Sequence, residues 1–175
     1  MFRKPSILLL FSGFLFLLAV GLAFSGWQGC RRRLEIMSLK NFYDVGRQAM
    51  KNRQFRRAES DFRFAVKAWE RAQKISGPEI LPGSRIEIDG CLLAGHCYRL
   101  LRRLRQAQKC YTRGLQYAPN SISLLTAYGG CAYNLGDYSA ALESLEKSNR
   151  IYPLKVEMRP ILETLRRWQR EQRDG

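Results

Sequence analysis

A spacing of 34 residues recurs in the second half of the chain and restricts its fold more than any other feature of the sequence. Residues separated by this spacing share their character, with small residues matching small ones and large apolar residues matching large ones. A repeat of this length is typical of a supersecondary unit that cannot bury its apolar face alone and must stack on its neighbours. The matching pairs are Gly95 and Gly129, Cys97 and Cys131, Leu101 and Leu135, Leu104 and Tyr138, Ala107 and Ala141, Tyr111 and Leu145, Gly114 and Ser148, and Pro119 and Pro153.

A third copy of the pattern lies upstream at an offset of 49 residues. Its Gly46, Phe55, Ala58, Phe62 and Ala65 correspond to Gly95, Leu104, Ala107, Tyr111 and Gly114. Because 49 exceeds 34 by 15, we expect an insertion of about fifteen residues after the first copy, near residues 73–87. Two runs in this range, Ser76-Gly77-Pro78 and Leu81-Pro82-Gly83-Ser84, are typical of turns.

Each copy also has a glycine in its expected first helix and an alanine in its expected second helix. Glycine inside a helix costs about 1 kcal/mol relative to alanine. A cost repeated at the same place in three copies predicts that the two helices of each unit touch closely there. The expected contacts are Gly46 with Ala58, Gly95 with Ala107, and Gly129 with Ala141.

Together these features resemble the tetratricopeptide repeat (TPR) family over roughly residues 39–153. The motif residues are the G-x-x-Y of Gly95 to Tyr98, the A-x-x-x-Y of Ala107 to Tyr111, and the terminal Pro119 and Pro153. The resemblance implies two antiparallel helices per repeat, stacked into a right-handed superhelix with a concave inner face. We therefore expect an all-α, TPR-type solenoid of helical hairpins, with about three repeats in residues 39–153.

The repeat pattern fails after Pro153, where a terminal repeat needs a cap over its apolar face. Ile161, Leu165 and Trp168 form a stripe at helical spacing, and charged residues follow to the end of the sequence. We expect residues 154–175 to form a capping helix, from Pro160 to about Gln172, and a charged tail.

The beginning of the sequence is apolar and has no charged residue from Pro5 to Cys30. We expect residues 1–30 to form a single transmembrane anchor, because the run approaches the roughly 20 apolar residues that a spanning helix needs. Two alternatives stay open: a cleaved signal segment, or a lipoprotein signal with Cys30 as the modified residue. Residues 31–38 are then a basic juxtamembrane linker.

The orientation of such an anchor is nearly balanced. The triple arginine Arg31 to Arg33 argues for a cytoplasmic repeat domain, whereas the very short segment before the anchor argues for the opposite. The expectation is a single-pass membrane protein with a slight preference for an extracytoplasmic, periplasmic repeat domain.

Resemblance to the family also implies a binding face, because such repeats hold an extended peptide or a partner helix with the inward side of each first helix. The face is basic, with aromatic and polar elements, so an acidic protein or peptide is the expected partner. The residues carried over to this groove are Tyr43, Arg47, Lys51, Leu92, His96, Arg99, Thr126, Tyr133 and Asn134, with Gly130 beside them.

The net charge of +15 indicates affinity for anionic surfaces. Arginines gather at the expected helix–helix turns of the first two units, which share one edge of a stacked solenoid, and we predict that this edge contacts anionic lipid headgroups. The predicted membrane-surface edge consists of Arg31, Arg32, Arg33, Arg53, Arg56, Arg57, Arg102, Arg103 and Arg105.

These observations predict a membrane-anchored scaffold that holds a protein partner for assembly of a membrane or envelope complex. The alternative is a basic helical-repeat protein that binds nucleic acid, which the anchor disfavours. No phosphate loop, metalloprotease motif or serine elbow is present, so we expect no enzyme, catalytic residue or cofactor. Five cysteines without a C-x-x-C pair and a single histidine, His96, indicate no zinc site, and the last four cysteines are expected to pack in the core.

Overall fold

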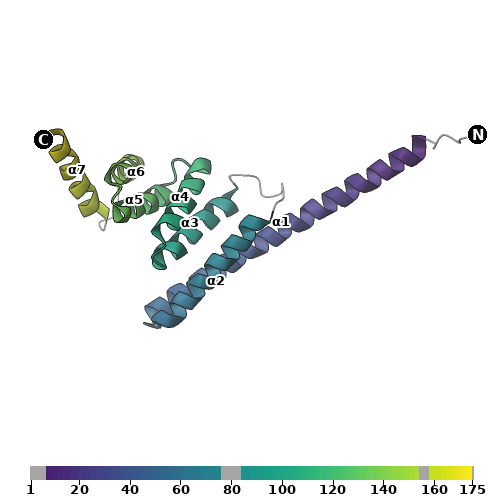
Figure 1. Cartoon of the computed structure of the whole chain (residues 1–175), viewed down its shortest axis with the longest axis horizontal. Coiled ribbons are helices and arrows are strands. Elements are labelled where there is room, and N and C mark those ends of the chain that lie inside the picture. The colour runs from purple at the N-terminus through teal and green to yellow at the C-terminus, as the bar shows by residue number, and fades with distance from the viewer. Residues whose placement is uncertain (1–6, 76–83, 154–157, 175) are drawn as a thin grey trace, which may run out of the picture.

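The computed structural model describes residues 7–75, 84–153 and 158–174, and for residues 7–17 and 25 only the backbone is described. These ranges contain seven α-helices and no strand, so the expected all-α fold is confirmed (Figure 1). The helices are α1 (Ile7–Lys51), α2 (Phe55–Lys74), α3 (Arg85–Leu100), α4 (Leu104–Tyr117), α5 (Ile122–Leu135), α6 (Tyr138–Ile151) and α7 (Arg159–Asp174).

The helices form three hairpins that stack in chain order, followed by a cap (Figure 1). The C-terminal part of α1 pairs with α2, α3 with α4, and α5 with α6, and α7 packs on α6. The turns within the hairpins contain Arg53, Arg102 and Gly136, which occupy equivalent places in the repeat and all have positive φ, at 58°, 60° and 81°. The repeat inferred from spacing is therefore also a repeat of backbone conformation.

Helix α1 runs without a break through residues 31–38, where the sequence suggested a linker. Ile36 in this stretch and Leu39 directly after it are buried, at 5% and 0% exposure, and Glu35 pairs with Arg71 of α2. An α-helix continues here because the segment already has an apolar face that α2 and α3 cover. The first hairpin therefore begins earlier in the sequence than the repeat pattern suggested.

The N-terminal half of α1 projects away from the stacked hairpins (Figure 1). The predicted anchor, residues 1–30, falls largely outside the described side chains, which begin at Leu18 and omit residue 25. Among the residues that were described, no helix has both the length and the apolar character required to cross a membrane.

The expected insertion after the first unit is partly helical. Helix α2 has 20 residues whereas its counterpart α4 has 14, and the extension buries Trp69 and Ala72. On the other side, Ser84 caps the N-terminus of α3 by accepting a hydrogen bond from the Glu87 amide. Residues 76–83, which include most of the predicted turn residues, lie outside the described part of the chain.

The repeated glycines do allow close helix contact, but mainly with a larger neighbour than expected. If each glycine carried a Cβ atom, that atom would lie within 2.7 Å of the side chain of the residue one helical turn after the expected alanine. At Gly129 the carbonyl oxygen of Ala141 is also close, at 3.3 Å from the same Cβ position. A bulky side chain from the second helix thus lies flat over each glycine. The pairs are Gly46 with Phe62, Gly95 with Tyr111, and Gly129 with Leu145.

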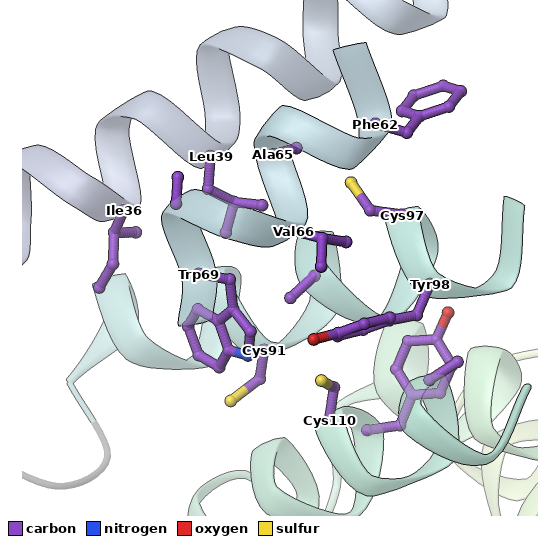
Figure 2. Close-up of a cluster of buried hydrophobic side chains, with 14 of the residues drawn as sticks. Ile36, Leu39, Phe62, Ala65, Val66, Trp69, Cys91, Cys97, Tyr98 and Cys110 are labelled. Atoms are coloured by element: carbon purple, nitrogen blue, oxygen red, sulfur yellow. The ribbon is translucent and has the colours of Figure 1, made fainter. Parts of the chain in front are cut away.

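The main core lies between the first two hairpins. Figure 2 shows Trp69 and Val66 of α2 directed towards Cys91 and Tyr98 of α3, with Cys110 of α4 beside them. Burial raises the pKa of the Cys91 thiol to about 12 and that of Cys110 to about 11, so both remain protonated and pack as small apolar groups. The expectation that the last four cysteines lie in the core is confirmed, since Cys91, Cys97, Cys110 and Cys131 are all buried and unpaired.

A second, smaller core joins the last hairpin to α7. Leu162 and Leu165 of α7 are buried against Leu142 and Leu145 of α6. At its edge, the ring of Trp168 meets Tyr138 at a centroid distance of 5.5 Å. The stripe recognised in the sequence therefore forms the packed face of α7.

Candidate functional site

The inner side of the solenoid contains a groove between α3, α5 and the start of α7. It encloses a volume of about 550 Å³. Basic, aromatic and amide side chains line one wall, and apolar residues from the end of α6 and from α7 line the other. The lining residues are His96, Arg99, Ile122, Ser123, Thr126, Ala127, Gly130, Tyr133, Asn134, Tyr152, Pro153, Met158 and Ile161.

Five of the nine residues predicted for the groove lie on its wall: His96, Arg99, Thr126, Tyr133 and Asn134. They come together because each occupies the inward face of a first helix, and stacking aligns those faces. The small Gly130 lies among them and leaves the floor open, with Met158 within 3.4 Å of where its Cβ would be.

The other four predicted residues lie elsewhere. Tyr43 and Arg47 extend the groove wall onto α1, because Tyr43 stacks on His96 and the Arg47 guanidinium lies over the Tyr43 ring at 5.8 Å. Leu92 is half-buried against the main core, and Lys51 is exposed at the end of α1, away from the groove lining.

His96 is held by aromatic neighbours on both sides. Its ring stacks on Tyr43 with centroids 6.2 Å apart, and its Nδ1 atom lies 3.0 Å from the Tyr111 hydroxyl. Burial and, to a smaller extent, the positive charges of Arg99 and Arg47 together lower the pKa of His96 to about 4. His96 is therefore neutral at physiological pH, and the positive charge of this region belongs to the two arginines.

The two arginines are available for a ligand charge. Neither Arg47 nor Arg99 forms an ion pair with a carboxylate in the described ranges. Arg99 is exposed at the mouth of the groove. Burial raises the pKa of Tyr111, and the positive charge of Arg99 only partly opposes this rise. A carboxylate entering the groove would meet uncompensated positive charge.

Sequence reasoning missed the apolar wall. Tyr152 and Pro153 end the last repeat, and Met158 and Ile161 belong to the following region, which we expected to act only as a cap. Tyr152 is 65% exposed in this position. The only available signal was its place directly before the terminal proline, and nothing in the spacing indicates that α7 turns back to border the groove.

A buried carboxylate was also missed. Glu87 in the first turn of α3 is 1% exposed and binds the guanidinium groups of Arg32 and Arg113 at 2.9 and 2.6 Å. Arg113 also donates to the side-chain oxygen of Gln73. The S-x-x-E pattern from Ser84 to Glu87 is a helix-start signal that could have placed this residue in α3 instead of in the insertion.

The predicted membrane-surface edge divides into two separate groups. Arg31 and Arg33 are exposed in the middle of α1, whereas Arg32 is only 11% exposed at its side chain and is occupied by Glu87, so it does not belong to a lipid-facing surface. The remaining six arginines surround the turns of the first two hairpins, at the far end of α1. Those six are Arg53, Arg56, Arg57, Arg102, Arg103 and Arg105.

No group of three or more histidine, cysteine, aspartate or glutamate side chains in the described ranges is placed to hold a metal ion.

The comparisons with known proteins agree with the repeat geometry. The tetratricopeptide repeat family pattern matches residues 88–121 and 122–153, which are the second and third hairpins. These two hairpins are therefore tetratricopeptide repeats, as their motif residues indicated. Such repeats point to a scaffold for protein interaction.

Among solved structures, the chain is similar to the C-terminal TPR-containing domain of an FK506-binding protein from Plasmodium falciparum. The TM-score is 0.59 at 20% sequence identity, with 81% of this chain and 94% of that chain covered. This similarity supports the solenoid fold. No curated protein matches the sequence significantly.

Proposed function

We propose that this protein is a membrane-tethered scaffold that holds an acidic, extended segment of a partner protein in the groove between α3, α5 and α7. The observation that carries the proposal is the groove of about 550 Å³ with Arg99 at its mouth and no carboxylate paired with that arginine in the described ranges. An arginine without a carboxylate partner favours a carboxylate ligand, because charge-assisted hydrogen bonds are stronger than neutral ones.

The two walls of the groove suit different parts of one peptide. Tyr133 and Asn134 offer a hydroxyl and an amide that can pair with a peptide backbone, while Tyr152, Met158 and Ile161 offer apolar contact area. A segment that places an acidic residue at Arg99 and an apolar residue against Met158 would use both walls. Mostly apolar lining with a few placed polar groups is typical of a specific binding site.

The tether is proposed from the sequence. Residues 5–30 include no charged side chain and are followed by Arg31 and Arg33, which would lie at the lipid headgroups. Trp27, with the Arg31 guanidinium 5.4 Å from its ring, suits the interface between membrane and water. We retain the preference for an extracytoplasmic repeat domain, where the scaffold would serve assembly of a membrane or envelope complex.

The groove can be tested by site-specific photo-crosslinking in native membranes. A photoreactive residue at Thr126, inside the groove, should crosslink to one acidic segment of a partner, and Arg99→Glu should abolish that product. The same residue at Arg167, exposed on α7, is the matched control. Equal products from both positions, or crosslinking that persists in Arg99→Glu, would remove the support for the groove.

Two further measurements separate the remaining parts of the proposal. Resistance of the full chain to carbonate extraction tests the tether, and extraction into the soluble fraction would contradict it without affecting the groove. Binding of a labelled single-stranded RNA tests the nucleic-acid alternative, which requires tight, strongly salt-dependent binding. We expect only weak binding from the net charge.

A further inference from the structure

We infer that the solenoid has a second docking surface, at the edge formed by the α1–α2 and α3–α4 turns, which takes an acidic, amphipathic helix of a partner protein. This surface, called the distal edge here, is separate from the groove. Its arginines are the six already placed at these turns: Arg53, Arg56, Arg57, Arg102, Arg103 and Arg105.

The centre of the distal edge is an apolar cleft. Met50 and Phe55 of the first hairpin face Leu100 and Leu101 of the second across a volume of about 310 Å³. Phe55 is 61% exposed and Met50 is 40% exposed. Apolar side chains gathered between two turns, instead of buried in the neighbouring core, are typical of a contact site for another molecule.

Arg102 lines the cleft, and the two turns beside the cleft carry further positive charge that the described residues do not neutralise. All six arginines are exposed, and none forms an ion pair in the described ranges. The acidic residue that lines the cleft, Glu59, is paired with Arg63 at 2.6 Å. The equivalent turn of the third hairpin has Gly136 and Asp137 instead, so the charge is restricted to the two turns that border the cleft.

Backbone conformation does not account for arginine at these turns. Arg53 and Arg102 have φ angles of 58° and 60°, in the left-handed region that glycine adopts at the equivalent Gly136. A non-glycine residue there costs about 1 kcal/mol. Two arginines therefore occupy positions where glycine would be more stable, so the local backbone gives no reason for their presence.

The position of the distal edge favours a protein over a lipid surface, and this step depends on the proposed tether. Lys51 lies 18 residues beyond Arg33 in the same unbroken helix, which at 1.5 Å per residue is about 27 Å. If Arg33 lies at the headgroups and α1 stands upright, the distal edge is well beyond the reach of the same bilayer. A helix with one apolar and one acidic face fits an apolar cleft bordered by arginines on two sides.

The experiment uses the full chain in nanodiscs of zwitterionic lipid and a fluorescent synthetic helix of about five turns, with leucine and phenylalanine on one face and glutamate on the other. The first variant combines Arg56→Glu with Arg105→Glu, and its matched control combines Arg167→Glu with Arg170→Glu on α7. Both variants change the net charge equally and alter exposed positions only. We expect affinity to fall about tenfold or more in the edge variant and less than about threefold in the control.

The apolar cleft is tested by Phe55→Ala, which should weaken binding several-fold while the melting temperature remains close to that of the wild type. A second probe with the same charge and serine on its apolar face should bind more weakly than the first. Equal losses of affinity in the edge and control variants, or equal binding of the two probes, would show that the net positive charge of the protein attracts the probe non-specifically. Either result would overturn the inference.

Anionic vesicles provide the remaining outcome. If the nanodisc-embedded chain binds vesicles of phosphatidylserine and phosphatidylcholine, and Arg56→Glu with Arg105→Glu abolishes that binding, the distal edge belongs to a lipid surface and the inference is wrong. Failure of the chain to insert into nanodiscs would contradict the proposed tether and not the docking surface. Binding of the two probe helices could then be measured on the chain in solution without lipid or detergent.

Discussion

The first and last hairpins have the same repeat architecture but are stabilised in different ways. The first hairpin is long, and two polar contacts join it to the second hairpin: Arg32 of α1 pairs with the buried Glu87 of α3, and Arg113 of α4 donates a hydrogen bond to Gln73 of α2. The last hairpin is short and is joined to α7 mainly through leucines, with one exposed pair between Arg166 and Glu146 at the border. The first interface thus combines a large apolar core with a buried ion pair, whereas the last depends mainly on apolar contacts.

The turns of the first and last hairpins also differ in their local stability. The first hairpin turns through Arg53 in a left-handed conformation, whereas the last turns through Gly136, after which Asp137 caps α6 by accepting a hydrogen bond from the Ala140 amide. Gly136 and Asp137 are local stabilising choices, while Arg53 is a locally unfavourable one. The comparison indicates that the turn of the last hairpin favours local stability, whereas the turn of the first hairpin does not.

The largest change in the free energy of unfolding is expected from the buried ion pair between the first two hairpins. Glu87→Gln removes the charge that compensates two arginines, one of them nearly buried, and we expect a loss of about 3 kcal/mol in the free energy of unfolding. Glu59→Gln, which breaks the exposed pair with Arg63, should change stability by less than about 0.5 kcal/mol. Urea denaturation of both variants measures the difference, and similar small losses would mean that the buried cluster contributes little.

A dependence of stability on pH is expected from the second hairpin, which lies between the two hairpins compared. The folded pKa of His96 is about 4, below the ordinary value of 6.5, so the unfolded chain takes up a proton first as the pH falls. The contribution is complete above pH 6.5 and is lost progressively between pH 6.5 and pH 4. From pH 7 to pH 5 we expect a loss of about 2 kcal/mol that is absent in His96→Gln. Parallel pH profiles for the two proteins would refute this.

In the last hairpin, two adjacent glycines should respond in opposite ways. A Cβ at Gly129 would lie 2.7 Å from Leu145, which is fully buried and cannot move aside, so Gly129→Ala should lose about 1–2 kcal/mol. A Cβ at Gly130 would make only ordinary contact with Met158, so Gly130→Ala should gain up to about 1 kcal/mol from helix propensity. Thermal denaturation of the two variants tests this prediction. Melting temperatures that shift in the same direction in both variants would contradict the packing described.

Exchange of the turn residues should give the smallest effects and tests the comparison directly. Arg102→Gly relieves a left-handed arginine and should stabilise the protein by about 0.5–1 kcal/mol, while Gly136→Ala should destabilise it by about 1 kcal/mol. Differential scanning calorimetry of the two single variants measures the change in melting temperature of each. If Arg102→Gly lowers the melting temperature, the arginine stabilises the fold, and its retention needs no explanation from binding.

Much of the architecture was predictable because it depends on local periodicity. The 34-residue spacing identified the second and third hairpins, and the stripe of Ile161, Leu165 and Trp168 identified α7. The inward face of each first helix follows from helix geometry, which is why His96 and Tyr133 could be assigned to the groove. Periodic patterns report which side of a helix is buried.

The sequence by itself thus determined the helical repeat, the cap and the composition of one groove wall. Only the tertiary structure decided that α1 continues through the supposed linker, that Arg32 is buried against Glu87, and that Tyr152 and Met158 complete the groove. It also separated the arginines of the turns from those in the middle of α1. The physical reason is that these features depend on contacts between residues far apart in sequence, and a pattern of local spacing has no information on which distant side chains will meet.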